Sequence, residues 1–548
     1  MANSGGVQMS LKTATSVFGL VAMGLSTSGG PAALADSNYF EPGNLLLSRA
    51  LYDNNPNNVQ QGAQLPPNCT ANCKTAISDG TYPYVWNNDT ADTSFGITAK
   101  IVLDQLTPSG VLVNSLEVPN SSQNGVPPTK DQMVTSFSSK SEVALNLSTD
   151  GQFVTFMGYL APINALDVSN SNTPAVVDPT NPVSETNFRV VAQVDSKGKF
   201  RFAKTNAYSG NNGRAAILNN TNGANVLYTA GNAGNGSGTQ PNGVIIGAGA
   251  QILSPQTKAL VAQEPGLSTP VGSFNITELG LQPDKIGKDT NFRGLTIFNN
   301  VIYTTKGSGS NGVNTVYFID TSGAADNMGN PHACPTGVGL PSSSATLPTT
   351  PIVYNAANLP TKGVFPYNMC ILNGFPKTKA STNTSFPFGV WFADAKTLYV
   401  ADEGNGDNTF NNGTYTNAAA QTTAGLQKWV FSAGSWTRVY TLSAGLELGI
   451  PYTIPDYPTG YNSVTNTPWA PATDGLRNIT GRVNGDGTVT IWAVTSTVSG
   501  NGDQGADPNK LVMITDTGPA ATFQTVLTAG FAEVLRGVSF TPGTVATQ

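Results

Sequence analysis

The chain is poor in charged residues. Asp, Glu, Lys and Arg make up 11% of its 548 residues, against roughly 25% in an average soluble protein. The net charge is −6 and basic residues form no run, which argues against a nucleic-acid partner. Because 39% of the residues are apolar and lie in short regular runs, we expect a folded core, with a surface made polar mainly by Asn, Ser, Thr and Gly.

Histidine is almost absent, since His332 is the single one. A Ser-His-Asp triad would have to use it, and no G-x-S-x-G motif is present. Metal sites with several histidines are excluded, and so are most zinc hydrolases. A phosphate-binding P-loop and a credible dinucleotide fingerprint are also missing. No motif therefore requires a cofactor.

Long apolar runs are missing after the N-terminus. Lys12 precedes an apolar run from Ala14 to Leu25, and a segment of small residues then ends in Ala-Leu-Ala at 33–35. This pattern predicts a signal peptide over 1–35 with a mature start near Asp36; a membrane anchor is the rival, for which the run is short. We expect an exported protein, secreted or periplasmic, with no membrane span.

Cysteines are few, and their spacing suits an exported protein. The pairings that close local loops join Cys69 to Cys73 and Cys334 to Cys370. Zinc binding is the alternative, which the C-x₃-C spacing and the absence of a nearby histidine disfavour.

What the chain does contain is a repeated pattern of short strands and turns, rich in Gly (59) and Pro (36). Residues 142–159 (EVALNLSTDGQFVTFMGY) predict two strands joined by a turn, and similar units open near 213, 292, 388 and 475. Strands at 44–53, 97–106 and 111–118 have no opening strand, and the strand from 535 has no blade after it.

These units predict an all-β fold, a six-bladed β-propeller of four-stranded blades, with seven blades as the alternative. The N- and C-terminal strands together form the closing blade, which removes exposed sheet edges. We expect one propeller domain over 36–548. Its largest loop insertion spans about 321–383, where no strand pattern is visible.

One blade resembles a known repeat. The stretch LYVADEGN at 398–405, followed by GLQKW at 425–429, resembles the NHL-type propeller repeat. The resemblance implies a propeller fold and leaves the activity open, because related propellers include binding modules, scaffolds, lyases and lactonases.

Arginine recurs at one position of the repeat. Four of the nine arginines stand just before the small residue that opens a blade: Arg214, Arg293, Arg477 and Arg536. Glu142 and Phe388 occupy this position in the other two blades. The first strand of each blade lines the central channel, so these residues are predicted to form a ring that binds a carboxylate or sulfate. Capping of carbonyls or pairing with acids between blades is the structural alternative.

Arginines around a propeller axis also resemble those of sialidases, in which three bind the substrate carboxylate. The chain departs from that family, because its S-x-D-x-G-x-T-W boxes are absent and the sequence alone does not single out a Tyr–Glu pair.

A second candidate site is the turn at 402–408. Asp402, Glu403 and Asp407 supply the oxygen ligands that Ca²⁺ prefers, although the spacing differs from that of an EF-hand. A solvated polar turn is the simpler alternative.

The sequence thus favours an exported binding or scaffold protein that recognises an extracellular glycan or protein, with an anionic ligand at the central channel. The alternative is an extracellular hydrolase or lyase acting on an anionic saccharide or ester.

Overall fold

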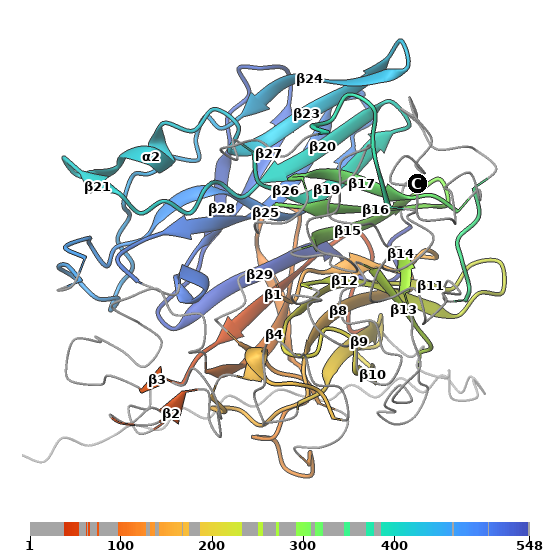
Figure 1. The fold of residues 1–548 in the computed structure, drawn as a ribbon, viewed down its shortest axis with the longest axis horizontal. Coiled ribbons are helices and arrows are strands. Elements are labelled where there is room, and N and C mark those ends of the chain that lie inside the picture. The colour runs from red at the N-terminus through yellow and green to blue at the C-terminus, as the bar shows by residue number, and fades with distance from the viewer. Residues whose placement is uncertain are drawn as a thin grey trace, which may run out of the picture. The chain divides into compact units, whose positions relative to one another are not determined.

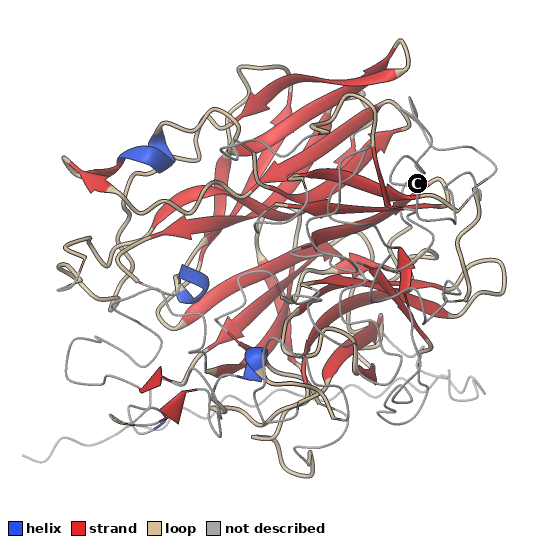
Figure 2. Ribbon diagram, viewed as in Figure 1, coloured by secondary structure: helices blue, strands red, loops and turns tan. Residues whose placement is uncertain are grey.

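Six four-stranded antiparallel sheets, arranged around an axis, form the molecule (Figures 1 and 2). The computed structural model describes residues 38–53, 97–127, 132–136, 142–166, 168–174, 187–232, 250–255, 292–307, 313–321, 345–350, 369–377, 385–462, 465–501 and 504–545, together with 58, 62, 64–65, 74–75 and 270–272. No helix in these ranges has the length and apolar character needed to cross a membrane.

Each sheet is a blade whose strands follow one another from the axis outward. The closing blade contains β29 (Glu533–Phe540), β1 (Leu45–Leu51), β4 (Thr98–Leu106) and β5 (Leu112–Glu117). The next contains β7 (Asn146–Leu147), β8 (Phe153–Tyr159), β9 (Arg189–Asp195) and β10 (Phe200–Thr205). The third contains β11 (Gly213–Asn219), β12 (Val226–Gly231), β13 (Ala250–Leu253) and β14 (Pro270–Gly272).

The other three blades follow in chain order. The fourth contains β15 (Phe292–Phe298), β16 (Val301–Lys306), β17 (Thr315–Ile319) and β18 (Met369–Ile371). The fifth contains β19 (Pro387–Asp394), β20 (Thr397–Asp402), β23 (Gly425–Ser432) and β24 (Ser435–Leu442). The sixth contains β25 (Ala472–Val483), β26 (Val489–Val498), β27 (Lys510–Asp516) and β28 (Gln524–Thr528).

Short elements lie in the connections. They are β2 (Gln64–Leu65) paired with β3 (Lys74–Thr75), β6 (Thr135–Ser136) paired with β4, β21 (Phe410–Asn411) paired with β22 (Thr414–Tyr415), the α-helix α2 (Thr416–Ala419), and the 3₁₀ turns η2 (Val168–Asn170) and η5 (Gln504–Ala506).

The closing blade confirms the predicted six-bladed architecture. In Figure 1 the blue strand β29 lies beside the red strand β1, and the two pair antiparallel from Leu45↔Phe540 to Leu51↔Glu533. Pairing the last described strand with the first three-strand set completes the closing blade, so the first and last parts of the chain join the ring of blades.

The innermost strands pack side by side around the axis in the order β7, β11, β15, β19, β25 and β29, and β29 returns to β7. Glycine makes this close approach possible. A Cβ atom at Gly294 would lie 2.1 Å from the carbonyl oxygen of Phe388, and one at Gly389 would lie 2.4 Å from that of Arg477. These contacts explain why a small residue opens these blades.

The core lies between neighbouring blades. Phe298 of β15 and Phe392 of β19 stack with ring centroids 4.6 Å apart, and Trp436 of β24 contacts Phe392 edge-on. Strands such as β16 and β26 are buried along their whole length because a blade on each side covers them. Apolar burial between the blades is the main stabilising contribution.

One detail of the sequence prediction is wrong. The sequence predicts no strand within 321–383, yet β18 (Met369–Ile371) lies in this segment, is buried, and pairs with β17 through Tyr317↔Ile371. The tripeptide Met-Cys-Ile is too short to show the alternation of a strand, and a long connection separates it from its partner.

Several predicted features lie outside the described residues. These are the signal peptide over 1–35, together with Cys69, Cys73 and Cys334. Cys370 is buried in β18. Both disulfide pairings therefore stay predictions.

Candidate functional site

The four predicted arginines occupy irregularities of the innermost strands. The pairing of β11 with β12 skips Arg214, and the pairing of β29 with β1 skips Arg536. The inner strands β15, β19 and β25 skip their equivalent residues in the same way: Arg293, Phe388 and Arg477. An extra residue in one strand redirects its side chain out of the usual alternation. The repeat position that the sequence singled out is thus a recurrent β-bulge.

Glu403 connects two of these arginines. It follows β20, in the blade that carries Phe388 where four others carry Arg. One carboxylate oxygen lies 3.4 Å from Nη2 of Arg293, and the other lies 3.4 Å from Nε of Arg477. All three residues are less than one-tenth exposed. Glu403 therefore balances part of the positive charge within the cluster.

Arg536 has a different set of partners. Its Nη2 donates to the hydroxyl of Tyr52 at 2.6 Å and to the backbone carbonyl of Ser136 at 3.4 Å. Its charge also reaches two other axial residues. It stabilises the ionised form of Glu142, and burial together with the charge of Arg536 lowers the pKa of Arg477. The predicted axial residues thus influence one another electrostatically.

Arg214 is the exception among the arginines. It is 5% exposed, and its Nε and Nη1 atoms are buried without a hydrogen-bond partner among the described residues. Burial and the nearby positive charge of Arg293 hold the pKa of Arg214 well below its ordinary value, although Glu403 acts in the opposite direction. A buried guanidinium without an acceptor is costly, so this group has capacity for a ligand.

Glu142 lies just before β7 and is fully buried. Its Oε2 accepts hydrogen bonds from Oγ1 of Thr135, at 2.9 Å, and from the backbone N–H of Ser136, at 3.2 Å. The hydroxyl of Tyr159 donates to its Oε1. Burial raises the pKa of Glu142 despite these bonds, and burial together with the charge of Glu142 raises the pKa of Tyr159.

The Tyr159–Glu142 pair was missed at the level of the sequence, although a signal for it exists. The hairpin pairs Asn146 with Thr155, and the same register continued by four residues in each direction places Glu142 opposite Tyr159. Asn212 donates from Nδ2 to the Tyr159 hydroxyl at 2.7 Å. Predicting this pair requires the register of the hairpin, because the two residues lie on opposite strands and not along one strand.

Arg189 was also missed, and it has a structural role. Its guanidinium donates to the backbone carbonyls of Asn187, Ser169 and Asn211 and lies 5.3 Å from the centre of the Tyr159 ring. Because backbone carbonyls engage its donors, Arg189 holds Tyr159 in place rather than binding a ligand.

Together the four arginines face two buried carboxylates, Glu142 and Glu403. If both acids are ionised, two positive charges remain in excess within the described part of the cluster. A fixed set of guanidinium groups in a low-dielectric site suits a carboxylate or sulfate, which each group can bind through two parallel hydrogen bonds. We call these six residues the axial arginine cluster: Glu142, Arg214, Arg293, Glu403, Arg477 and Arg536.

The calcium candidates do not converge. Oδ2 of Asp402 accepts from Ser385, from the backbone of Phe386 and from Gln427, whereas Asp407 accepts from Thr409 and Asn417 at an exposed turn. Across the described ranges, no group of three or more His, Cys, Asp or Glu side chains is placed to hold a metal ion. The calcium site stays a prediction.

Asp402 gives a pH-dependent expectation instead. Burial raises its pKa to about 6 even though donated hydrogen bonds act to lower it. An Asp in the unfolded chain titrates near 3.9, so between about pH 4 and pH 6 the folded state binds the additional proton. The stability that this proton confers is lost as the pH rises through 6. We expect the free energy of unfolding to fall by about 1 kcal/mol more in the wild type than in Asp402→Asn between pH 5 and pH 7.

Chemical denaturation at several pH values measures this difference. Asp407→Asn is the control, because its half-buried carboxyl has a lowered pKa and titrates below that range. Equal slopes for wild type and Asp402→Asn would contradict the assignment.

No family model matches the chain, and no curated protein matches its sequence. A solved structure to which it is similar is a functionally unknown protein from Desulfotomaculum acetoxidans, with 11% identity, a TM-score of 0.32, and coverage of 82% of this chain and 98% of that one. The N-terminal domain of Nup159 has 8% identity and a TM-score of 0.29, with coverage of 91% and 88%. A polysaccharide lyase, the PL25 ulvan lyase, has 10% identity and a TM-score of 0.29, with coverage of 81% and 90%. At these values the likenesses carry no argument about activity, and the six-bladed β-propeller fold rests on the pairing of the strands themselves.

Proposed function

We propose that the chain is an exported β-propeller binding protein that holds an anionic group, a carboxylate or sulfate of an extracellular glycan, at the axial arginine cluster. The observation that carries this proposal is Arg214, whose Nε and Nη1 are buried and have no acceptor in the part of the chain that the structure describes. Buried donors in native proteins nearly always have a partner, so a missing one calls for a ligand, a water or an ion.

The surroundings of Arg214 favour an anion over a neutral acceptor. Arg293 is close enough for its charge to act with burial in lowering the pKa of Arg214, and Glu403 already engages Arg293 and Arg477. A bound anion would offset the repulsion between the guanidinium groups of Arg214 and Arg293 as well as supply the missing acceptors. The two parallel hydrogen bonds and the opposite charge would then both stabilise the bound anion.

The extracellular setting of the ligand is supported by the sequence. The N-terminal pattern of Lys12, the apolar run 14–25 and Ala-Leu-Ala at 33–35 is typical of a signal peptide, and four cysteines suit an oxidising compartment. The likeness of 398–405 and 425–429 to an NHL-type repeat fits a binding or scaffold role. A glycan or protein outside the cytoplasm is the partner proposed.

Replacing Arg214 by Met tests the proposal, because Met removes the charge and keeps much of the length. We expect the ligand-free variant to be more stable than the wild type by about 1–3 kcal/mol, since an unpaired buried guanidinium is no longer desolvated. We expect its affinity for sulfate and for D-glucuronate to fall at least about tenfold. Isothermal titration calorimetry and thermal unfolding measure the two effects.

Arg438→Met is the matched control, since Arg438 is exposed on the outer strand β24. It should leave both affinity and stability unchanged. A purely structural role for Arg214 would give the opposite result in the test variant: lower stability with no change in anion affinity. That outcome would end the proposal.

A second candidate is a hydrolase or lyase that acts on an anionic saccharide or ester. The observation that favours it is the hydrogen-bonded pair of Tyr159 and Glu142, which lies close enough to Arg214 for the charge of Glu142 to act on that guanidinium. A phenol held against a carboxylate can exchange a proton, and guanidinium groups can stabilise a developing negative charge. A disaccharide of D-glucuronate with an intact glycosidic bond, and the methyl ester of D-glucuronate, separate the two candidates: release of products identifies an enzyme, and binding without turnover identifies a binding protein.

A further inference from the structure

A cavity lies at the opposite ends of the same innermost strands. It has a volume of about 230 Å³, and all six inner strands contribute to its lining. On each inner strand that carries an arginine of the axial arginine cluster, this arginine precedes the residues that line the cavity, as Arg214 precedes Ile217 on β11 and Arg293 precedes Thr296 on β15. The cavity therefore lies on the propeller axis, away from the axial arginine cluster.

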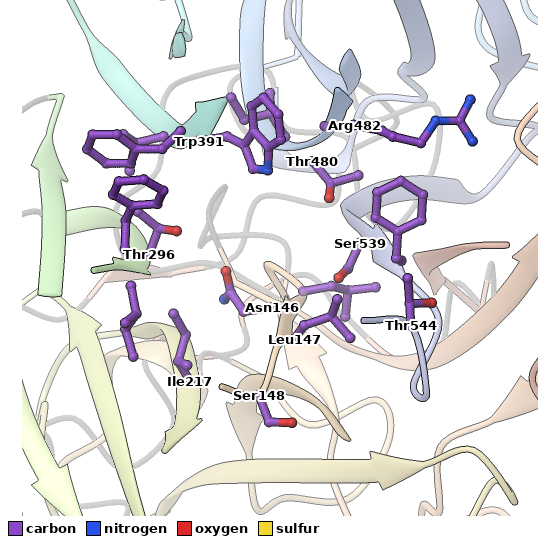
Figure 3. A pocket seen from close by; sticks show the side chains of 18 of the residues that line it. Asn146, Leu147, Ser148, Ile217, Thr296, Trp391, Thr480, Arg482, Ser539 and Thr544 are labelled. Atoms are coloured by element: carbon purple, nitrogen blue, oxygen red, sulfur yellow. The ribbon is translucent and has the colours of Figure 1, made fainter. Parts of the chain in front are cut away.

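The lining combines apolar and uncharged polar side chains. Figure 3 shows Asn146, Thr296, Thr480 and Ser539 around the cavity, together with the indole of Trp391. Arg482 is the one charged residue in the described lining, and its guanidinium lies 5.6 Å from the centre of the Trp492 ring, stacked on that side chain. The other described lining residues carry no charge, which favours a ligand without charge.

Three hydroxyl groups of this lining have no hydrogen-bond partner in the described part of the chain, whereas those of Ser148 and Thr544 are engaged. Among the described residues, Thr296, Thr480 and Ser539 form no hydrogen bond through their side chains. Asn146 uses its Nδ2 in a bond of 3.2 Å to the carbonyl of Ala216, which leaves its Oδ1 as an acceptor. Polar groups that converge on a cavity without partners are available to bind a ligand with several hydroxyl groups.

The position of Trp391 is fixed by its neighbour on β25. A Cβ atom at Gly481 would lie 2.8 Å from Cε3 of Trp391, so the absence of a side chain lets the indole pack against the backbone of β25. The indole also lies 6.2 Å from the ring of Tyr399, centre to centre. A rigid, partly exposed aromatic face beside hydroxyl groups suits an amphipathic ring.

We propose that this cavity binds one neutral sugar ring, whose apolar face packs on Trp391 and whose hydroxyl groups bind Asn146, Thr480 and Ser539. Its volume limits the ligand to about one ring, because drug-sized molecules occupy pockets of roughly 300–1,000 Å³. The site is independent of the proposed anion site, since its lining shares no residue with the axial arginine cluster.

Saturation-transfer NMR and titration calorimetry with methyl glycosides of glucose, galactose, mannose and N-acetylglucosamine test the site. We expect at least one of them to bind. Thr480→Val with Ser539→Ala removes two hydroxyl groups with little change of shape and should weaken that binding about tenfold. Trp391→Ala should weaken it by a similar or larger factor.

Two controls make the result specific. Thr437→Val changes an exposed threonine of β24 and should bind the glycoside as the wild type does. Arg214→Met should also bind it normally, so that failure of the anion site and failure of this site are distinguishable. Cyclohexanol serves as a ring without the set of hydroxyl groups. The proposal is overturned if no glycoside binds, if cyclohexanol binds more tightly than every glycoside, or if the Thr480→Val, Ser539→Ala variant keeps full affinity.

Discussion

Replacement of Glu403 by Gln is expected to lower the free energy of unfolding by about 3–5 kcal/mol, the usual cost of removing one partner of a buried ion pair. Glu403 is the shared partner of Arg293 and Arg477, with both contacts at 3.4 Å, and it is 8% exposed. Gln keeps the shape but removes the negative charge, so two buried guanidinium groups lose their compensation at once.

Addition of an anion should recover part of this loss. In the wild type, Glu403 competes with an anionic ligand for the two arginines, whereas in Glu403→Gln sulfate can take its place. We expect a larger stabilisation by sulfate in the variant than in the wild type, measured as the shift of the melting temperature. Glu447→Gln, at an exposed turn, is the control and should show neither effect. Wild-type stability in Glu403→Gln would mean that the ion pairs contribute nothing.

The sequence was sufficient to predict the blades because each is built from local hairpins with clear turns. The closing blade was predictable for another reason. The three N-terminal strands lack an opening strand, and the C-terminal strand lacks the rest of a blade, so only together do they form a four-stranded sheet. In contrast, β18 is three residues long and pairs with a strand about fifty residues away, so neither periodicity nor a turn marks it.

The candidate site was predictable only in part, and the reason is geometric. Repetition identified Arg214, Arg293, Arg477 and Arg536, because equivalent positions of a propeller meet at the axis. Glu403 follows the second strand of its blade and was assigned to a different site, since nothing in its own neighbourhood indicates that it reaches arginines on two other strands. Contacts between blades depend on tertiary packing, which a repeat alignment does not contain.

The recurrent bulge has a consequence for stability as well as for the site. The residue that follows each bulged arginine or phenylalanine lies where one inner strand meets the next. At Gly294 a Cβ atom would lie 2.1 Å from the backbone oxygen of Phe388 and 3.1 Å from its carbonyl carbon. Both obstructing atoms belong to the backbone, so no side-chain rotation can relieve the contact.

Gly294→Ala is therefore expected to destabilise the protein by about 3 kcal/mol or more, at the upper end of the range for overpacking. Gly294 has no positive φ, so the effect would come from the contact and not from an unfavourable backbone conformation.

The control is Gly485→Ala, because Gly485 also lacks a positive φ and a Cβ atom there would meet no other atom within 4 Å. Denaturant titration of both variants measures the difference between their free energies of unfolding. Because alanine at 485 costs little, this difference should be close to the whole destabilisation by Gly294→Ala. If Gly294→Ala unfolds at the same denaturant concentration as Gly485→Ala, β15 and β19 do not pack at this distance. If the loss is confirmed, sulfate binding at the axial arginine cluster should weaken as well, because the same contact sets the spacing between Arg293 and its neighbours.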